Sequence, residues 1–355
     1  MRAGCEELHP SMTPEISVLD LVPVRAGQTS AQAVASSLAL VELADRLGVR
    51  RYWFAEHHNM PSVASTSPPV LAAAAAMRTE RVRLGSGGVM LPNHSPLIVA
   101  EQFAALEALA PGRIDLGIGR APGSDPVITQ LLRRSGTTSD VDRFPEHVND
   151  ILALASPTGA TVRFVSGEEY RVLATPAAGG LPEVWLLGSS DYSAQLAAAQ
   201  GLPYVFANHF AGEGLERALQ LYRSQFRPSE IAAEPRTFIT ANVIASPTAE
   251  EAEERMLPYA RMMARLRGNR PMAPLETVEQ AAAAETEDHF AAPLIDALRR
   301  RWFVGAGAEV RERLAAFAAQ HGVDEVMVSL VAGAYDAEPV DAAPGRVQTL
   351  EQLFS

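Results

Sequence analysis

The fold of this chain is decided by the stretch 82–118, which reads VRLGSGGVMLPNHSPLIVAEQFAALEALAPGRIDLGI. It begins with an apolar run at 82–90 that has the length of a buried strand. A helical pattern follows at 97–109 up to a Pro-Gly pair, and a second apolar run occupies 113–118. The stretch therefore predicts a strand, a helix and a second strand, which is the repeating unit of parallel α/β folds.

The same unit repeats on both sides of this stretch. The predicted main strands are 16–22, 51–56, 82–90, 113–118, 183–187, 204–207, 237–245 and 325–330. Regular alternation with helices calls for a parallel sheet with right-handed connections. Eight such units in 355 residues fit one closed barrel better than the two domains suggested by a prior of about 150 residues per domain. We predict an α/β fold, a (β/α)8 TIM barrel in a single domain spanning 1–355.

Three segments depart from this alternation. After a helical region at 125–155, two short strands flank Ser166-Gly167 and predict a β-hairpin inserted before the fifth barrel strand. The polar segment 1–14 is expected to be a flexible tail. The segment 268–289 is rich in Pro, Asn, Glu and Ala without a clear period, so we predict a mobile lid loop there.

Composition excludes several classes of function. The chain has no lysine, 30 basic and 42 acidic residues and a formal charge of −12, which disfavours nucleic-acid binding and excludes a Schiff-base or P-loop lysine. The single cysteine, Cys5, excludes an intrachain disulfide and cysteine-rich metal sites, and no metal-binding histidine spacing occurs. Without a signal peptide or an apolar stretch of about 18 residues, we expect a cytoplasmic protein that binds no membrane.

Polar residues gather directly after the predicted strands, where TIM barrels carry their active sites. Five strand ends carry such groups, and these are Glu56-His57-His58-Asn59, Asn93-His94, Gly119-Arg120, Gly188-Ser189-Ser190 and Asn208-His209. Neighbouring residues of an extended chain point to opposite sides, so His57 and His58 are a poor chelating pair and one of them is expected to be structural. His94 and His209, each taken alone, favour loop histidines that make backbone contacts.

The turn after the fifth barrel strand predicts an anion site. Residues 188–193 read GSSDYS and join the strand to a helix, whose free N–H groups and dipole favour a phosphate. Ser190 and Ser193 can add hydroxyl hydrogen bonds, and Arg120 on the neighbouring loop can supply a bidentate counter-charge. The alternative is simple capping of the helix by Ser190 or Asp191. The dinucleotide fingerprint is not met near Arg120, and no Gly-x-Ser-x-Gly elbow occurs.

Taken in order, four motifs resemble the luciferase-like flavin-dependent monooxygenases, the family of bacterial luciferase, over nearly the whole chain. The motifs are WFAEHHN at 53–59, GSGGVMLPNHSP at 85–96, PGRIDLGIGR at 111–120 and LGSS at 187–190 running to GLP at 201–203. The resemblance implies a TIM barrel that binds FMN and holds its phosphate with Arg120, Ser189, Ser190 and Ser193. It further implies a non-proline cis peptide at Gly87-Gly88 against the flavin ring, with Asn93 beside the cofactor.

For the chemistry, the resemblance maps the family's catalytic histidine onto His57, with Glu56 or a backbone group setting its tautomer. Luciferase has a cysteine just before the phosphate-binding arginine, whereas this chain has Gly119. This departure puts light emission and the substrate preference of luciferase in doubt and excludes an active-site thiol at this position.

The implied activity is a two-component monooxygenase. Reduced FMN from a separate flavin reductase reacts with O2 to a C4a-hydroperoxyflavin, which oxygenates a small organic substrate, either an aldehyde or an aromatic or polyketide natural product. Two alternatives stay open: a hydride-transferring oxidoreductase that uses a deazaflavin or NAD(P)H, and a non-catalytic flavin-binding protein. Family relatives are often dimers, so a homodimer is expected.

Overall fold

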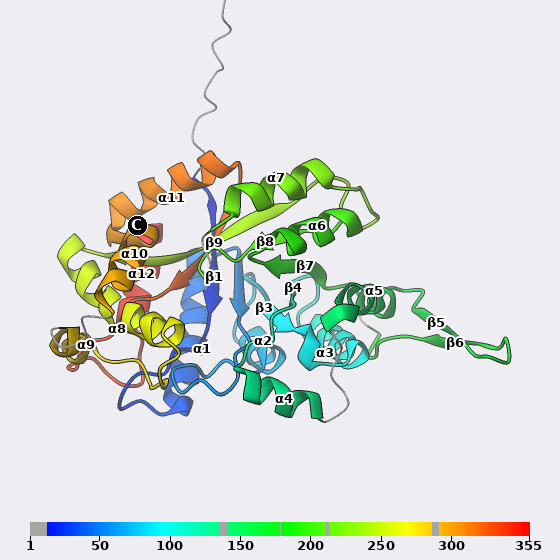
Figure 1. The fold of residues 1–355 in the computed structure, drawn as a ribbon, viewed down its shortest axis with the longest axis horizontal. Coiled ribbons are helices and arrows are strands. Elements are labelled where there is room, and N and C mark those ends of the chain that lie inside the picture. Colours follow the sequence, from blue (N-terminus) through cyan, green and yellow to red (C-terminus); the bar gives the residue numbers. More distant parts are fainter. Residues whose placement is uncertain (1–12, 135–140, 178, 211–212, 286–290) are drawn as a thin grey trace, which may run out of the picture.

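Eight parallel strands close into a barrel in the computed structural model, which describes residues 13–134, 141–177, 179–210, 213–285 and 291–355 (Figure 1). The barrel strands are β1 (Glu15–Asp20), β2 (Arg51–Phe54), β3 (Arg83–Met90), β4 (Ile114–Gly119), β7 (Glu183–Gly188), β8 (Tyr204–Phe206), β9 (Thr237–Ser246) and β11 (Glu325–Leu330). They pair in this order, and β11 returns to β1 with Ile16 opposite Val326. The predicted (β/α)8 barrel is confirmed.

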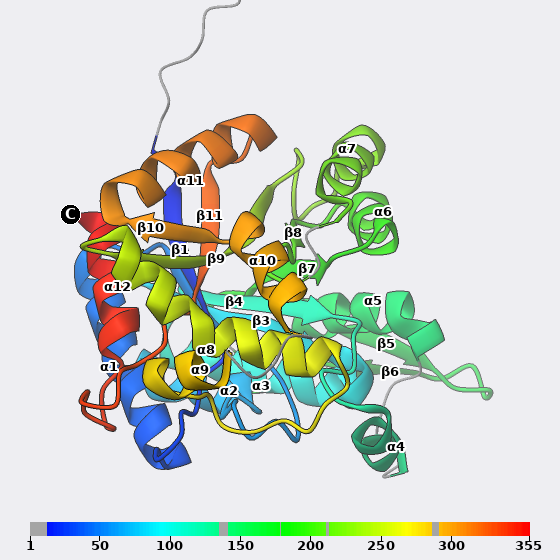
Figure 2. The same cartoon turned by 60° about the vertical axis from the view of Figure 1, so that its left-hand side comes forward.

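Helices surround the barrel on its outside, as Figures 1 and 2 show from two directions. They are α1 (Ser30–Leu47), α2 (Pro68–Ala76), α3 (Pro96–Leu109), α4 (Pro126–Arg134), α5 (Phe144–Ala155), α6 (Asp191–Gln200), α7 (Leu215–Gln225), α8 (Ala249–Arg267), α9 (Val278–Glu285), α10 (Ala292–Arg301), α11 (Gly307–His321) and α12 (Pro344–Phe354), with short 3₁₀ turns η1 (Leu91–Asn93) and η2 (Val141–Arg143). Local signals fix their ends. A capping box of Thr29 and Gln32 starts α1, and Gly48 in the left-handed conformation ends it.

The inserted hairpin is confirmed as β5 (Ala160–Arg163) and β6 (Glu169–Val172), which pair antiparallel and project away from the barrel (Figure 1). Two expectations need correction. The segment 268–289 is not a loop throughout, because α9 forms within it, while 286–290 lies outside the described residues. A ninth strand, β10 (Phe303–Ala306), extends the sheet by pairing with the end of β9. Most of the predicted tail, residues 1–12 with Cys5, also lies outside the description.

The inside of the barrel is filled by large side chains from six of its strands. This inner cluster consists of Leu19, Trp53, Ala55, Trp185, Val205, Phe238 and Met327. The rings of Trp185 and Phe238 have centroids 4.8 Å apart. Glycine occupies Gly85 and Gly87 on the inward face of β3 and Gly117 on that of β4, and a Cβ atom on Gly117 would clash with the Ser86 carbonyl oxygen. At Gly87 the place of a Cβ atom lies against Leu19 and Trp53, so the barrel is a packed core rather than a pore.

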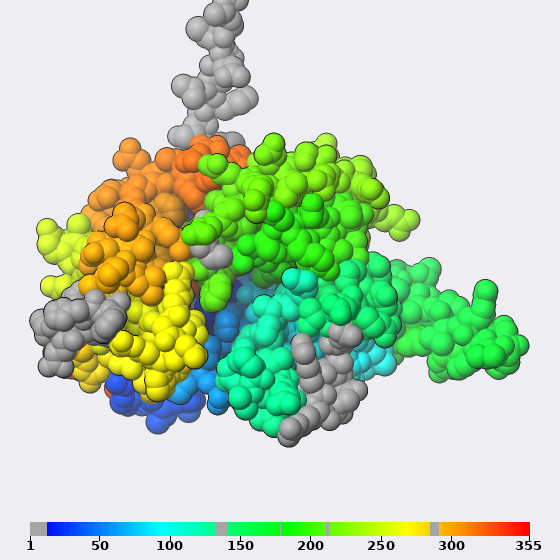
Figure 3. Space-filling model, in the orientation of Figure 1, coloured from blue at the N-terminus to red at the C-terminus, as the bar shows by residue number. Residues whose placement is uncertain are grey.

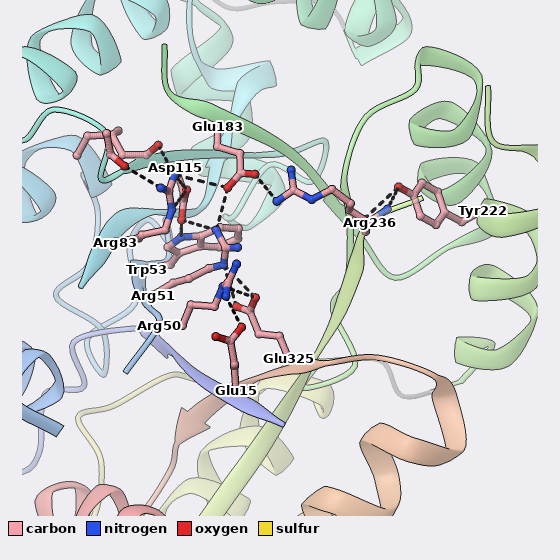
Figure 4. Close-up of polar contacts among 12 residues, drawn as sticks. Glu15, Arg50, Arg51, Trp53, Arg83, Asp115, Glu183, Tyr222, Arg236 and Glu325 are labelled. Atoms are coloured by element: carbon pink, nitrogen blue, oxygen red, sulfur yellow. Dashed lines mark hydrogen bonds and ion pairs between the residues drawn. The ribbon is translucent and has the colours of Figure 1, made fainter. Parts of the chain in front are cut away.

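A buried ion network closes the end of the barrel at which the strands begin (Figure 4). The guanidinium of Arg51, which is fully buried, lies 2.9 Å from the Asp115 carboxylate through Nη1 and 2.8 Å from Glu325 through Nε. Trp53 Nε1 donates to Asp115 over 2.9 Å, and Arg83 also pairs with Asp115. Burial alone would lower the pKa of Arg51, but these carboxylates raise it, so Arg51 keeps its charge.

Candidate active site at the barrel mouth

Polar side chains follow the inner cluster at the carboxyl ends of the strands, where they form a rim at the barrel mouth. Residues two apart on a strand share a face, so Trp53 and Ala55 inside the barrel place His57 on the inward side. By the same rule Phe238 leads to Thr240 and Asn242 on β9. The turn after β8 brings His209 to the same place, because its ring Nδ1 lies 2.7 Å from Thr240 Oγ1. The polar rim of the barrel mouth is defined here as His57, His209, Thr240 and Asn242.

The opposite wall of the mouth is formed by glycines of β3 and β4. The peptide bond Gly87-Gly88 is cis, as expected from the resemblance, and the β3–β4 register shifts at this point. A Cβ atom on Gly88 would lie 2.9 Å from the Gly117 carbonyl oxygen, and one on Gly119 would lie 3.1 Å from Met90 Sδ. The absence of side chains on this wall allows a flat ring to approach the backbone. Figure 3 shows the surface hollowed between α8, in yellow, and α4, in blue-green.

His57 lies half-buried at this mouth. Its backbone N–H donates to the Ser65 carbonyl oxygen over 3.0 Å, while its ring makes no hydrogen bond to another described residue. Burial lowers the pKa of His57; the negative charge of Glu56 opposes this effect, and His58 adds to it. The ring is therefore neutral at pH 7 and able to accept a proton.

Glu56 lies on the other side of the strand end from His57. Its buried carboxylate accepts hydrogen bonds from His58 Nε2 at 2.9 Å, from His94 Nε2 at 2.8 Å and from the Met90 backbone N–H at 3.0 Å. Burial alone would raise the pKa of Glu56, but the two histidines and the Met90 N–H lower it to about 2. The option that Glu56 sets the tautomer of His57 is corrected, because its hydrogen bonds go to His58 and His94.

Asn93 contacts the same group of residues around Glu56. Its side-chain amide donates to the Pro122 carbonyl oxygen over 2.8 Å and lies 3.4 Å from Glu56 Oε1. Asn93, predicted as a cofactor contact, therefore ties the loop after β4 to the loop after β3. His94, for which sequence favoured a backbone contact, instead bonds a buried carboxylate.

The sequence did not predict that His209 belongs to the candidate site. Its ring Nδ1 and its backbone N both contact Thr240 Oγ1, at 2.7 and 3.1 Å, and Asn242 Nδ2 donates to its carbonyl oxygen over 2.8 Å. Burial, together with a smaller effect of the positive charge that His57 can carry, lowers the pKa of His209 to about 4. The signal available in the sequence was the pair of polar residues, Thr240 and Asn242, on one face of the otherwise apolar strand 237–245.

The predicted anion site forms where the loops after β4 and β7 meet. The guanidinium carbon of Arg120 lies 4.0 Å from the ring centroid of Tyr192, the second residue of α6, and no carboxylate in the described chain pairs with this arginine. Ser190 is the N-cap residue of α6 but makes no side-chain capping bond, which excludes the simple capping alternative for its hydroxyl. Ser193 donates to the Ser190 carbonyl oxygen over 2.8 Å, so its proton is already used.

Asp191, the other residue weighed as a cap, is paired with Arg217 of α7 at 2.8 Å. Free helix N–H groups, the Ser189 and Ser190 hydroxyls and Arg120 remain to receive an anion. A bare glycine wall on β3 and β4 followed by this anion site fits a flat ring that carries a phosphate. No group of three or more metal-binding side chains occurs in the described chain, and no helix of the described segments is long and apolar enough to cross a membrane.

Comparisons with known proteins agree with this geometry. A family model described as luciferase-like monooxygenase matches residues 14–325. A protein of Escherichia coli (strain K12) named luciferase-like monooxygenase is 41% identical over 323 residues, which cover 89% of this chain and 91% of that protein.

Solved structures extend the likeness to three dimensions. Apo-MsnO8 aligns with a TM-score of 0.82 and 30% identity, covering 97% of this chain and 98% of that chain. The oxygenating constituent of 3,6-diketocamphane monooxygenase from Pseudomonas putida, a type II Baeyer-Villiger monooxygenase solved in complex with FMN, aligns with a TM-score of 0.71, 19% identity and 96% and 97% coverage, which shows the common fold. The match over residues 14–325 and the 41% identity together show that the chain belongs to the luciferase-like monooxygenase family.

Proposed function

We propose that this oxidoreductase is the oxygenating component of a two-component, FMN-dependent monooxygenase. Reduced FMN supplies two electrons and two protons, so that one atom of O2 enters the organic substrate and the other leaves as water. The observation that carries the proposal is the glycine wall of β3 and β4 near Arg120 and the start of α6. Within the described residues Arg120 has no ion pair, and Ser190 makes no side-chain capping bond. An aldehyde or an aromatic or polyketide natural product is the proposed substrate.

The residues of the chain would divide the work by position. Arg120, Ser189, Ser190 and the first N–H groups of α6 would hold the phosphate. The ring would lie against Gly87-Gly88, where no side chain intervenes. His57, half-buried and neutral, would take a proton from the reacting groups and return it. The segment after α8 would cover the mouth and exclude water, because the Arg267 side chain at the end of α8 already reaches the Phe210 carbonyl oxygen.

The test combines turnover with cofactor binding. The purified protein is supplied with a flavin reductase, NADH, FMN and ¹⁸O2, and a panel of aldehydes and aromatic compounds is screened by mass spectrometry for a product that carries one ¹⁸O atom. Absence of any labelled product, or tight binding of a deazaflavin by a protein that has no affinity for FMN, would favour the hydride-transfer alternative or a non-catalytic flavin-binding protein.

Arg120→Ala tests the anion site directly. Loss of a charge-assisted contact to phosphate should weaken FMN binding roughly 10- to 100-fold in a fluorescence titration. Arg217→Ala is the matched control, because Arg217 is an exposed arginine that contacts α6 through Asp191. Equal FMN affinity of wild type and Arg120→Ala would mean that the phosphate is held elsewhere.

The expected partners follow from the same proposal. We propose a cytoplasmic homodimer that receives reduced FMN from a flavin reductase. Light scattering of the purified protein measures the dimer, and the rate of product formation at increasing reductase concentration measures the delivery of reduced FMN. A monomeric mass would contradict the first expectation without affecting the second.

A further inference from the structure

Met90, the last residue of β3, places a thioether beside the glycine wall of the barrel mouth. In the parallel register of β3 and β4, Met90 lies opposite Gly119. The preceding residues on the two strands, Val89 and Ile118, belong to the hydrophobic cluster that the strands share with the surrounding helices. Successive side chains of a strand point to opposite faces, so Met90 and Gly119 face the inside of the barrel.

The Met90 sulfur lies over Gly119. A Cβ atom on Gly119 would be 3.1 Å from Met90 Sδ, and one on Gly123 would be 3.0 Å from Met90 Cγ. A Cβ atom on Gly88, in turn, would be 3.2 Å from the Gly119 backbone nitrogen. The Met90 side chain therefore continues the glycine wall against which the flavin ring is proposed to lie, and its sulfur lies at the edge of that wall.

Packing in the core does not account for the Met90 side chain. Met90 is half-buried, and it belongs to none of the three hydrophobic clusters formed by the described part of the chain. Its backbone N–H donates to the buried Glu56 carboxylate over 3.0 Å, which fixes the backbone from which the side chain starts. A thioether is soft and polarizable, and it takes up one oxygen atom to become a sulfoxide. An oxidisable sulfur is thus held at the barrel mouth.

We propose that Met90 is a self-oxidation site, whose thioether takes one atom of O2 when no organic substrate occupies the mouth. A sulfur–oxygen bond forms, and the thioether is oxidised to the sulfoxide. The O–O bond breaks, and the second oxygen atom leaves as water with two electrons and two protons from reduced FMN. The inference rests on the proposed function, because it uses the same oxidant and the same electron donor with the protein's own sulfur in place of the substrate.

Peroxide footprinting tests the position of the sulfur without turnover. The full chain, with and without saturating oxidised FMN, is treated with dilute hydrogen peroxide and digested with trypsin. Because the chain has no lysine, cleavage at arginine releases the fragment 84–113, in which Met90 is the single methionine. Bound FMN should slow sulfoxide formation at Met90 roughly 10-fold, since oxidation follows the exposure of the sulfur. Met77, which follows α2 and is 72% exposed, should react equally in both samples. An equal rate at Met90 with FMN bound overturns the inference.

Self-oxidation itself is measured with a flavin reductase, NADH, FMN and ¹⁸O2 in the absence of any organic substrate, with catalase present to remove free hydrogen peroxide. Mass spectrometry should find one ¹⁸O atom on the fragment 84–113 in most chains, while Met77 stays unlabelled. In Met90→Leu the fragment should carry no label, which excludes oxidation of a neighbour such as His94. An unlabelled fragment in wild type, equal labelling of Met77, or a labelled fragment in Met90→Leu overturns the self-oxidation site.

The failure of this inference and the failure of the proposed function give different results. If a fluorescence titration shows that FMN does not bind, the proposed function fails and self-oxidation fails with it. If a substrate is oxygenated but Met90 stays unlabelled in its absence, self-oxidation alone is wrong. A labelled Met90 in a protein that oxygenates no compound of the panel supports self-oxidation and shows that the proposed substrate class is wrong.

Discussion

Glu56 accepts hydrogen bonds at both of its carboxylate oxygens, and its position explains why it was expected to act with His57. The two residues are neighbours in the chain, but a strand end sends successive side chains to opposite sides. Glu56 consequently joins His58, His94 and Asn93 in fixing the loops after β2, β3 and β4. Its pKa of about 2 keeps it ionised at neutral pH, which suits an organising anion better than a proton carrier.

The depressed pKa of Glu56 makes the free energy of unfolding depend on pH. The ionised form is favoured in the folded state, so its contribution is complete above the ordinary pKa of 4.5 and is lost as the pH falls toward 2. Glu56→Gln should lower the free energy of unfolding by about 3 kcal/mol near pH 6, and this difference from wild type should shrink below pH 4.5. Urea unfolding at several pH values measures it.

Glu42→Gln is the control for this measurement, because Glu42 is a partly exposed glutamate of α1 that pairs with Arg78 at the surface. It should differ from wild type by less than about 1 kcal/mol at every pH. A difference for Glu56→Gln that stays constant from pH 6 to pH 3 would show that the hydrogen bonds to His58 and His94 do not depend on the charge.

Two glycines of β4 that lie two positions apart should respond differently to the same substitution. A Cβ atom on Gly117 would meet the backbone oxygen of Ser86, which cannot move without shifting β3. The nearest atom to a Cβ on Gly119 would be the Met90 sulfur at 3.1 Å, near the flexible end of a side chain. Gly117→Ala should therefore lower the free energy of unfolding by about 3 kcal/mol or more, whereas Gly119→Ala should stay within about 1 kcal/mol of wild type.

Denaturant unfolding of the two variants provides the comparison, each being the control for the other. Gly119 also stands where luciferase has its cysteine, so tolerance of alanine there would show that the space beside the mouth is available for a side chain. Similar losses in both variants would mean that β4 is sensitive to any side chain, whatever atom it meets.

At the level of elements, the sequence predicted the barrel strands because each is a short, mainly apolar run that alternates with a helical pattern. It missed β10, which has only four residues and follows an arginine-rich helix, because so short a run is ambiguous without its partner strand. It missed α9 because alanine and glutamate give no apolar stripe, and packing against α8 supplies what the pattern lacks.

The candidate site was predicted only in part, because some of its contacts join residues that are far apart in the chain. Arg120 and the serine turn follow from strand ends and helix starts, which are local signals. The contact of His209 with Thr240 joins residues 31 apart in the chain, and it becomes visible only when the inward faces of β8 and β9 are aligned. Evaluating each histidine alone therefore favoured the wrong surroundings for His94 and His209.

Across the whole molecule, the two ends of the barrel have separate tasks. The end where the strands begin is locked by Arg51 and its carboxylates, and the other end carries the polar rim. Arg51→Leu would leave Asp115 and Glu325 buried without this partner, so it should lower the free energy of unfolding by about 3 to 5 kcal/mol. Below its unfolding temperature the variant should still bind FMN as wild type does, since the mouth is unchanged.

Arg50→Ala is the matched control, because Arg50 contacts Glu15 and Glu325 in the same region but its side chain is 39% exposed. An exposed ion pair contributes less than about 1 kcal/mol. Calorimetric unfolding and FMN titration of both variants measure the two effects. A loss of FMN affinity in folded Arg51→Leu would show that the ends of the barrel are coupled.

The projecting β5–β6 hairpin offers a place where the chain can be lengthened. Its turn at Ser166-Gly167 is exposed, and Gly167 has a left-handed backbone conformation. The hairpin packs mainly on α5 and stands apart from both ends of the barrel (Figures 1 and 3). A fluorescent reporter or an affinity peptide inserted in this turn would therefore lie away from the substrate entrance. The inserted peptide would allow the enzyme to be immobilised in one orientation.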